Sequence, residues 1–143
     1  MPLGIALVCL VIGVSDGDTV TVRCESADGQ ENLKIRIAEI DAPEKGQAFG
    51  SRSKQHLAEL CFQKQAIVTP RATDRYHRTV ATVACEGADA GNEQVQSGMA
   101  WVFDRYVTDR SLYTIQEVAR SEGRGLWIDP SPVPPWEWRK AKR

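Results

Sequence analysis

Three short segments of the chain concentrate acidic and basic side chains. The first, 16–19, reads Asp-Gly-Asp-Thr and lies between two runs of β-branched residues. The second begins at Arg36, within a run rich in isoleucine, and continues to Asp41 and Glu44 on either side of a proline. The third, 74–78, reads Asp-Arg-Tyr-His-Arg. These residue types are suited to acid–base, metal and phosphate chemistry.

Together the three segments could form one site for phosphoryl chemistry. Carboxylates from two separate strand ends can converge on one hard cation, which accepts oxygen ligands including backbone carbonyls and water. Two arginines from different elements can then bind a phosphate opposite that cation. Such a site combines metal polarisation, charge neutralisation and a base for water. Phosphoryl transfer depends mainly on this kind of positioning and electrostatics.

Each segment alone has a simpler interpretation. Asp and Gly are common at a hairpin tip for conformational reasons. Arg36 with Asp41 and Glu44 could form a salt bridge beside a solvated loop, and a charged connector such as 74–78 is usually only solvated. The chemical interpretation therefore requires a fold that brings the three segments together.

Runs rich in β-branched residues predict five strands, at 7–14, 19–24, 33–40, 66–70 and 79–85. An Asp-Gly pair between the first two runs predicts a tight hairpin turn at Asp16 and Gly17, because both central residues there take positive φ. The third run stops near Pro43, since proline cannot continue a hydrogen-bonded ladder.

Apolar residues three and four positions apart predict three helices. They lie at 47–64, at 92–97 and from 112 to near Gly123 or Gly125. The proline-rich tail, 130–143, is predicted to be extended chain packed on the surface by its tryptophans. Five strands with a helix after the third suggest an α+β fold with a mainly β core, a five-stranded Greek-key barrel of the OB type. A plain α+β sandwich is the alternative.

The composition predicts one globular domain, 1–143. The chain has 143 residues, of which 42% are hydrophobic and 26% charged, and these ordinary values exclude a disordered chain, a collagen-like repeat and a coiled coil. Lys and Arg number 18 and Asp and Glu 19, so the net charge is −1. That balance argues against affinity that comes from bulk positive charge on nucleic acid.

The first dozen residues are apolar. This segment is too short for a membrane-spanning helix, which needs about 20 residues. It also lacks the positive start and the small-residue cleavage site of a signal peptide. We interpret it as a strand behind an initiator Met that could have replaced a removed leader.

An even number of cysteines permits two disulfides in an oxidising compartment. A two-residue Asp-Gly turn pairs residues whose numbers sum to 33, which places Cys9 opposite Cys24 provided that no bulge shifts the register. By elimination Cys61 would pair with Cys85. The alternative is four buried free thiols. Two disulfides would indicate an exported protein, periplasmic or secreted, while a cytoplasmic location stays open.

The three charged segments, read with their flanks, resemble the signature blocks of the staphylococcal nuclease (thermonuclease) homologue family. The blocks lie at 14–20, 35–44 and 74–81, and the likeness continues into 98–102, 125–127 and 138–139. The resemblance implies an OB-fold barrel with three helices and a Ca²⁺-dependent phosphodiesterase that acts on DNA and RNA. We expect a monomer with a nucleic-acid substrate and no membrane partner.

The resemblance also implies roles for single residues around the metal. Asp18 and Asp41 would bind Ca²⁺ through their side chains, and Ala42 through its backbone carbonyl. Glu44 would orient or deprotonate the attacking water.

Arginines would bind the substrate. Arg36 and Arg78 match the two arginines that hold the scissile phosphate in the family. Arginine suits this role because its planar guanidinium forms bidentate hydrogen bonds and stays protonated. Arg78 could also assist departure of the 5′-oxygen. Asp16 and Thr19 would position Asp18 without binding the metal themselves.

More distant substrate contacts are implied for Arg75, Tyr76 and Tyr106, with Arg75 on a terminal phosphate and Tyr106 against the nucleotide. Two positions depart from the family pattern. Asp104 stands where the prototype has a second aromatic residue, and His77 stands where many homologues have glycine. His77 is then either a tolerated loop residue or a group that shifts the pH optimum.

Two classes of function remain: a nuclease, and a catalytically silent OB-fold module that binds nucleic acid. Silent modules usually lose one or more of the metal, acid–base and phosphate-binding residues. This chain has all five, namely Asp18, Arg36, Asp41, Glu44 and Arg78. The sequence therefore favours the enzyme.

Overall fold

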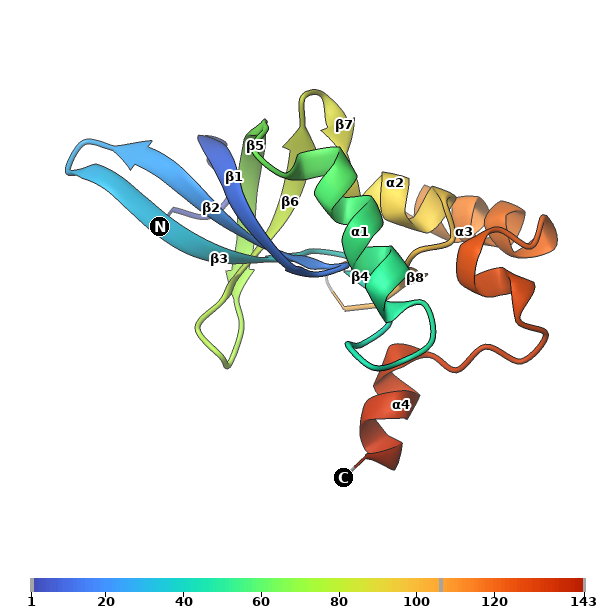
Figure 1. The fold of residues 1–143 in the computed structure, drawn as a ribbon. Helices are drawn as coiled ribbons and strands as arrows, with labels where there is room; N and C mark the ends of the chain where they lie inside the picture. The colour runs from blue at the N-terminus through green and yellow to red at the C-terminus, as the bar shows by residue number, and fades with distance from the viewer. Residues whose placement is uncertain (1, 106, 143) are drawn as a thin grey trace.

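A closed β-barrel forms one side of the molecule, and most of the helices lie on the other (Figure 1). The structure is a computed structural model and describes residues 2–105 and 107–142. Within these residues the barrel strands are β1 (Leu7–Asp16), β2 (Thr19–Ser26), β3 (Gly29–Ile37), β5 (Gln65–Thr73) and β6 (Thr79–Cys85). The order is β3-β2-β1-β5-β6, and a parallel pairing of residues 35–37 with 79–81 closes the barrel. The predicted α+β fold with a five-stranded barrel is confirmed.

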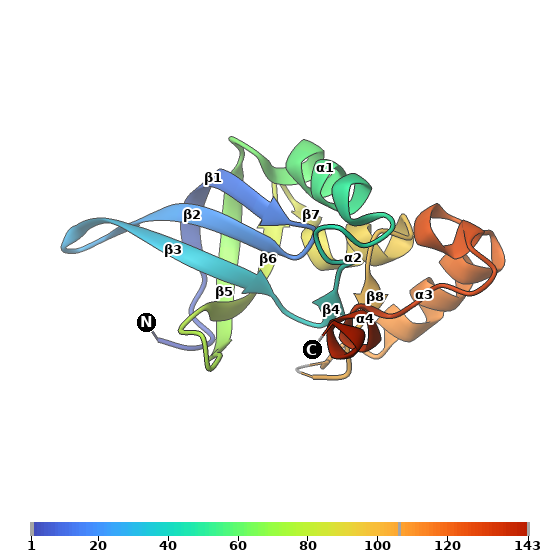
Figure 2. The ribbon, with the colours of Figure 1, turned by 60° about the horizontal axis from the view of Figure 1, so that its bottom comes forward.

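The helices and three short strands lie outside the barrel. They are β4 (Ile40–Asp41), β7 (Ala88–Asp89), β8 (Trp101–Val102), α1 (Gly50–Cys61), α2 (Ala90–Gln96), α3 (Ser111–Ser121), the 3₁₀ turn η1 (Gly125–Ile128) and α4 (Pro135–Ala141). β4 pairs with β8 in a separate small sheet, next to which α4 lies (Figure 2). In the described part of the chain, no helix is both long and apolar enough to cross a bilayer.

Two sequence expectations about the elements are wrong. The third strand ends at Ile37 rather than 40, because Glu39 takes a left-handed conformation (φ 75) that breaks the extended chain before β4. The tail was expected to be extended, yet its end forms α4, which makes four helices rather than three in the described residues. The helix starts at Pro135, and proline suits a first helical position because its missing N–H has no helical partner there.

The hairpin turn also differs from the expectation. Asp16 pairs with Thr19, so the turn residues are Gly17 and Asp18. Two register shifts in β1 then return the ladder to the pairing of Cys9 with Cys24. The predicted disulfide Cys9–Cys24 is therefore present, although the turn that predicted it is not.

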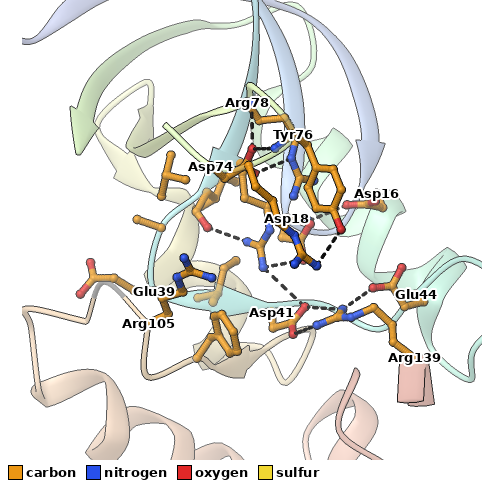
Figure 3. A pocket seen from close by; sticks show the side chains of 17 residues that line it. Asp16, Asp18, Glu39, Asp41, Glu44, Asp74, Tyr76, Arg78, Arg105 and Arg139 are labelled. Atoms are coloured by element: carbon orange, nitrogen blue, oxygen red, sulfur yellow. Dashed lines mark hydrogen bonds and ion pairs between the residues drawn. The ribbon is translucent and has the colours of Figure 1, made fainter. Parts of the chain in front are cut away.

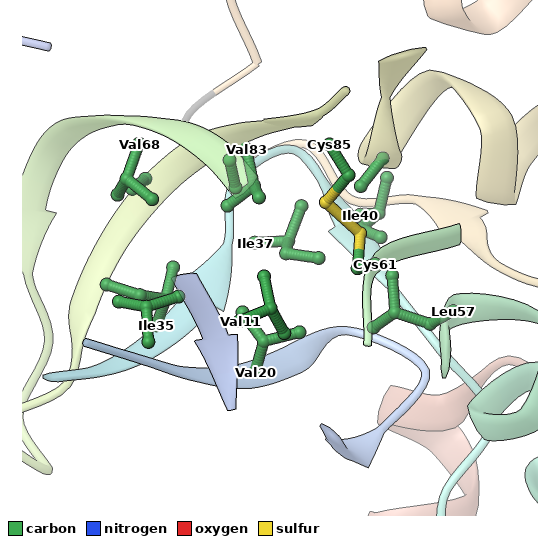
Figure 4. Close-up of a cluster of buried hydrophobic side chains, with 14 of the residues drawn as sticks. Val11, Val20, Ile35, Ile37, Ile40, Leu57, Cys61, Val68, Val83 and Cys85 are labelled. Carbon is green, nitrogen blue, oxygen red and sulfur yellow. A yellow bond between two sulfur atoms is a disulfide. The ribbon is translucent and has the colours of Figure 1, made fainter. Parts of the chain in front are cut away.

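The barrel interior is filled by buried β-branched side chains from all of its strands (Figure 4). Leu57 of α1 covers one end of this core, and the disulfide between Cys61 and Cys85 ties the same helix to β6. The second predicted disulfide is thus also present. Each fully buried Ile or Leu stabilises the fold by about 1.5–3 kcal/mol, so this core stabilises the strands that carry the charged segments.

Candidate active site

One cavity of about 380 Å³ opens where β1, β3, β4, the β5–β6 connector and α4 meet (Figure 3). It brings together predicted residues from all three charged segments: Asp16, Asp18, Arg36, Asp41, Glu44, Arg75, Tyr76 and Arg78. Thr19 and Ala42 lie behind it, in contact with Asp18. Tyr106 lies outside the described residues.

A close backbone approach fixes the turn that carries Asp18. A Cβ atom on Gly17 would lie 1.7 Å from Ser53 Oγ and 2.9 Å from the Cβ of Ala42, so the turn packs directly on α1 and the β4 loop. The buried side chain of Gln94 donates to the carbonyl oxygens of Gly17 (2.8 Å) and Ser53 (3.1 Å). The position of Asp18 is therefore set by packing on two helices and not by the hairpin alone.

Asp18 is buried but well partnered. Its Oδ2 accepts from the backbone N–H of Ala42 at 2.8 Å, and its Oδ1 accepts from the Thr19 hydroxyl at 2.9 Å. Arg36 Nη2 lies 3.6 Å from Oδ2. Burial opposes ionisation, but the attraction of Arg36 and these hydrogen bonds outweigh it and lower the pKa of Asp18. Asp18 is therefore a carboxylate.

Asp16 behaves in the opposite way. Burial, a side-chain hydrogen bond with Asp18 and repulsion by the Asp18 charge raise the pKa of Asp16 to about 7. Two neighbouring carboxyl groups with separated pKa values hold one proton between them in mildly acidic solution.

Asp41 and Arg36 meet beside Asp18. Arg36 Nη2 is 3.5 Å from Asp41 Oδ1, and Nη1 donates to the Ile37 carbonyl at 2.8 Å. Asp41 is only 1% exposed, and its burial raises its pKa despite the hydrogen bond from Arg139 and the charge of Arg36. One guanidinium thus lies between two buried carboxylates.

Glu39 also lines the cavity, two residues before Asp41, and sequence reasoning did not assign it a role. Its carboxylate accepts from the backbone N–H groups of Thr108 (2.8 Å) and Asp109 (3.1 Å), and Arg71 lies 3.5 Å away. These contacts hold the left-handed turn between β3 and β4. The available signal was a carboxylate within the isoleucine-rich run 33–40.

Asp74 holds the connector 74–78 together through hydrogen bonds to its other residues. Its Oδ2 accepts from Arg78 Nε at 2.8 Å, and its Oδ1 accepts the backbone N–H groups of Tyr76 and Arg78. Arg75 and Arg78 lie over the Tyr76 ring, at 5.0 and 5.4 Å from its centroid. His77 has φ 63, which explains why glycine suits this position in the family pattern.

An arginine of the tail also lines the cavity, and the sequence analysis gave it no role there. Arg139 of α4 donates to both oxygens of Asp41, at 3.1 and 2.7 Å, and also to Glu44 Oε1. These acidic partners raise the pKa of Arg139. The family resemblance extended to Trp138 and Arg139, and that was the available signal.

The donor set fits a hydrated divalent cation. Asp18 and Asp41 lie on either side of one Arg36 nitrogen, and carboxylate oxygens are the ligands that Ca²⁺ prefers. Each carboxylate oxygen has a second lone pair beyond the hydrogen bonds described. No cluster of three or more His, Cys, Asp or Glu side chains that could hold a metal occurs among residues 2–105 and 107–142. Backbone oxygen and water would have to complete such a shell.

Comparison with known proteins identifies the family of this chain. A family model described as staphylococcal nuclease homologue matches residues 34–129. The chain is 42% identical over 135 residues to a Haemophilus influenzae protein named an uncharacterized endonuclease. The aligned region is 94% of this chain and 74% of that protein. The chain is 39% identical over 144 residues to a micrococcal nuclease of Shigella flexneri, with 93% and 80% covered. A staphylococcal-like nuclease of Arabidopsis thaliana is 32% identical over 113 residues, with 79% and 35% covered.

The barrel and these matches define a nuclease-type hydrolase. The chain belongs to the staphylococcal nuclease homologue family.

Proposed function

We propose that the protein is a Ca²⁺-dependent nuclease that hydrolyses phosphodiester bonds of DNA and RNA by in-line attack of water. One observation carries this proposal. Asp18, Arg36, Asp41, Glu44 and Arg78 come from separate segments and line a single cavity. The names of the relatives support nuclease activity.

The carboxylates divide into two roles. Asp18 and Asp41 would hold the cation, with the backbone carbonyl of Ala42 as a further ligand. When bound, Ca²⁺ would supply positive charge that polarises the phosphate. Glu44 is more accessible, with 31% of its side chain exposed, so it can reach water at the cavity mouth. It would orient that water or accept its proton.

The arginines would neutralise the phosphate. Arg78 is oriented by the hydrogen bond from its Nε to Asp74. Arg36 lies beside the two carboxylates and would contact the phosphate next to the cation. Tyr76 is 62% exposed and Arg75 lies over its ring, so this pair can contact the nucleic-acid strand beyond the scissile bond.

We also infer that the chain works as one domain, as a monomer, and outside the cytoplasm. Support for export comes from the two disulfides, Cys9–Cys24 and Cys61–Cys85, because such bonds persist in oxidising compartments.

Incubation of supercoiled plasmid DNA and of RNA with the protein, in Ca²⁺ and in chelator, tests the function. We expect cleavage of both substrates in Ca²⁺ only. Glu44→Gln should lower kcat by about 10²–10⁴-fold, the range for a lost general base. The matched control is Glu117→Gln, which removes an exposed carboxylate on α3 and should leave kcat unchanged. If Ca²⁺ supports no cleavage, the enzyme is refuted, and retained binding in a gel-shift assay would favour the silent module.

A further inference from the structure

The site contains an arginine that the proposed function does not use. Arg139 lies in α4, 98 residues beyond Asp41 in the chain, and its guanidinium lies between Asp41 and Glu44 (Figure 3). It donates to both oxygens of Asp41 and to one oxygen of Glu44. It therefore joins a proposed metal ligand to the proposed base.

We propose that Arg139 is a positioning residue of the active site, and that α4 is part of the catalytic machinery through it. This inference rests on the proposed nuclease function, since it assigns Arg139 the task of holding Glu44 in place. Arg139 itself touches neither the phosphate nor the water in this proposal.

The geometry of the contact suits positioning. A guanidinium is a rigid planar fork, so two bonds to Asp41 fix its orientation as well as its distance. Asp41 is 1% exposed, and its Oδ1 also contacts Arg36, so burial and a second arginine hold this carboxyl group independently of Arg139. Nη1 of Arg139, which already donates to Asp41, also donates to Glu44, so it gives this residue on a more exposed loop a fixed partner.

The helix that presents Arg139 is anchored without its help. Trp136 packs against Trp101, with ring centroids 5.6 Å apart, and against Phe103 at 5.8 Å. Pro135 at the helix start is buried. Arg139 is therefore presented from a fixed support, and its charge is not needed to dock α4.

A second link joins the tail to the Glu44 loop. The backbone N–H of Glu44 donates to Gln47 Oε1 at 2.9 Å, and Gln47 Nε2 donates to the Val133 carbonyl at 2.8 Å. The tail therefore holds Glu44 twice, at its side chain through Arg139 and at its backbone through Gln47. Two contacts that converge on one residue indicate that the tail orders this loop.

Amide hydrogen exchange of the metal-free protein tests the positioning without any activity. In Arg139→Gln the amides of Glu44 and Gln47 should exchange about 10-fold faster than in the wild type, because local opening becomes easier. Lys140→Gln is the matched control, since it removes a charge from an exposed position of the same helix and should change these rates by less than about twofold. Unchanged exchange in Arg139→Gln overturns the proposal.

Kinetics in Ca²⁺ tests the consequence for the reaction. Arg139→Gln should lower kcat by about 10–100-fold with KM within about twofold, because misplacement of a catalytic group affects the chemical step. Arg139→Lys should recover part of kcat. In a Glu44→Gln background the same substitution should cost less than about threefold, since residues that act together are not additive.

Opposite results separate the alternatives. An equal loss of kcat with and without Glu44 overturns the proposal, as does a wild-type kcat in Arg139→Gln. A higher rate with tighter Ca²⁺ binding by calorimetry also overturns it, because Arg139 would then compete with the cation. A wild-type protein that cleaves nothing refutes the proposed function instead, and the exchange rates then decide the positioning by themselves.

Discussion

Asp16 lies beside the buried carboxylate of Asp18, and burial disfavours a second negative charge there. Asp16→Asn places a neutral side chain of the same shape there. We expect this substitution to stabilise the metal-free protein at neutral and alkaline pH and to have little effect in acid. The reason is that wild-type Asp16 is already neutral in acid, since burial and the contact with Asp18 raise its pKa to about 7.

The sign follows from proton linkage. The folded protein keeps the Asp16 proton up to a pH of about 7, whereas the unfolded chain releases it near the ordinary pKa of an aspartate, 3.8. Its contribution to stability is therefore complete below about pH 4 and is lost as the pH rises through about 7. Three pKa units correspond to an upper limit of about 4 kcal/mol at 1.36 kcal/mol per unit. Because Asp16 is partly exposed and shares its proton with Asp18, we expect about 2 kcal/mol.

Urea unfolding in chelator, at about pH 4.5 and about pH 8, measures this effect. The quantity compared is the difference in unfolding free energy between Asp16→Asn and the wild type at each pH. Asp28→Asn, in the exposed turn after β2, controls for general charge removal. If the difference in unfolding free energy between Asp16→Asn and the wild type is equal at the two pH values, the reasoning is refuted. Asp16 would then have the same pKa in the folded and the unfolded protein.

Two further predictions concern the supports of the site. Gly17→Ala should destabilise the protein by about 2 kcal/mol or more, since the new Cβ would lie 1.7 Å from Ser53 Oγ, and a loss below about 0.5 kcal/mol in urea unfolding would contradict this packing. Replacement of Cys61 and Cys85 by alanine removes a crosslink over 24 residues and should cost about 3.5 kcal/mol by loop closure. Native alkylation followed by intact-mass measurement should find no reactive thiol in the wild type, and an unchanged urea midpoint in the double variant would contradict the estimate.

The barrel and the meeting of the three charged segments could be predicted because local signals encode them. Alternating β-branched residues mark strands, and charged residues next to strand ends must lie at the rim of a closed barrel. The sixth strand is an example, since 79–85 was predicted with the observed bounds. Arg36 and Arg78 lie within and just before strands that pair, so their proximity follows from the topology.

Other features depend on contacts that no local pattern shows. Arg139 meets Glu44 across 95 residues, and its segment was hidden by prolines that suggest extended chain. The helix there begins on one of these prolines. The turn at Gly17 and Asp18 depends on two bulges in β1, which a register count from the turn cannot reveal. Each of these is set by tertiary packing, which overrides local preference.

The parallel pairing of β3 with β6 has a consequence for the time course of folding. β1, β2 and β3 form one antiparallel meander and β5 and β6 one hairpin, and both can form from contacts between near neighbours. Two long-range pairings join these units, β1 with β5 and β3 with β6. The second is the seam that closes the barrel and pairs Arg36 with Val80, and its loop-closure entropy delays it. Arg36 and Arg78 therefore come together only when the seam closes. During refolding, nuclease activity should appear with the slowest structural phase, so that partly folded chains cannot cut nucleic acid.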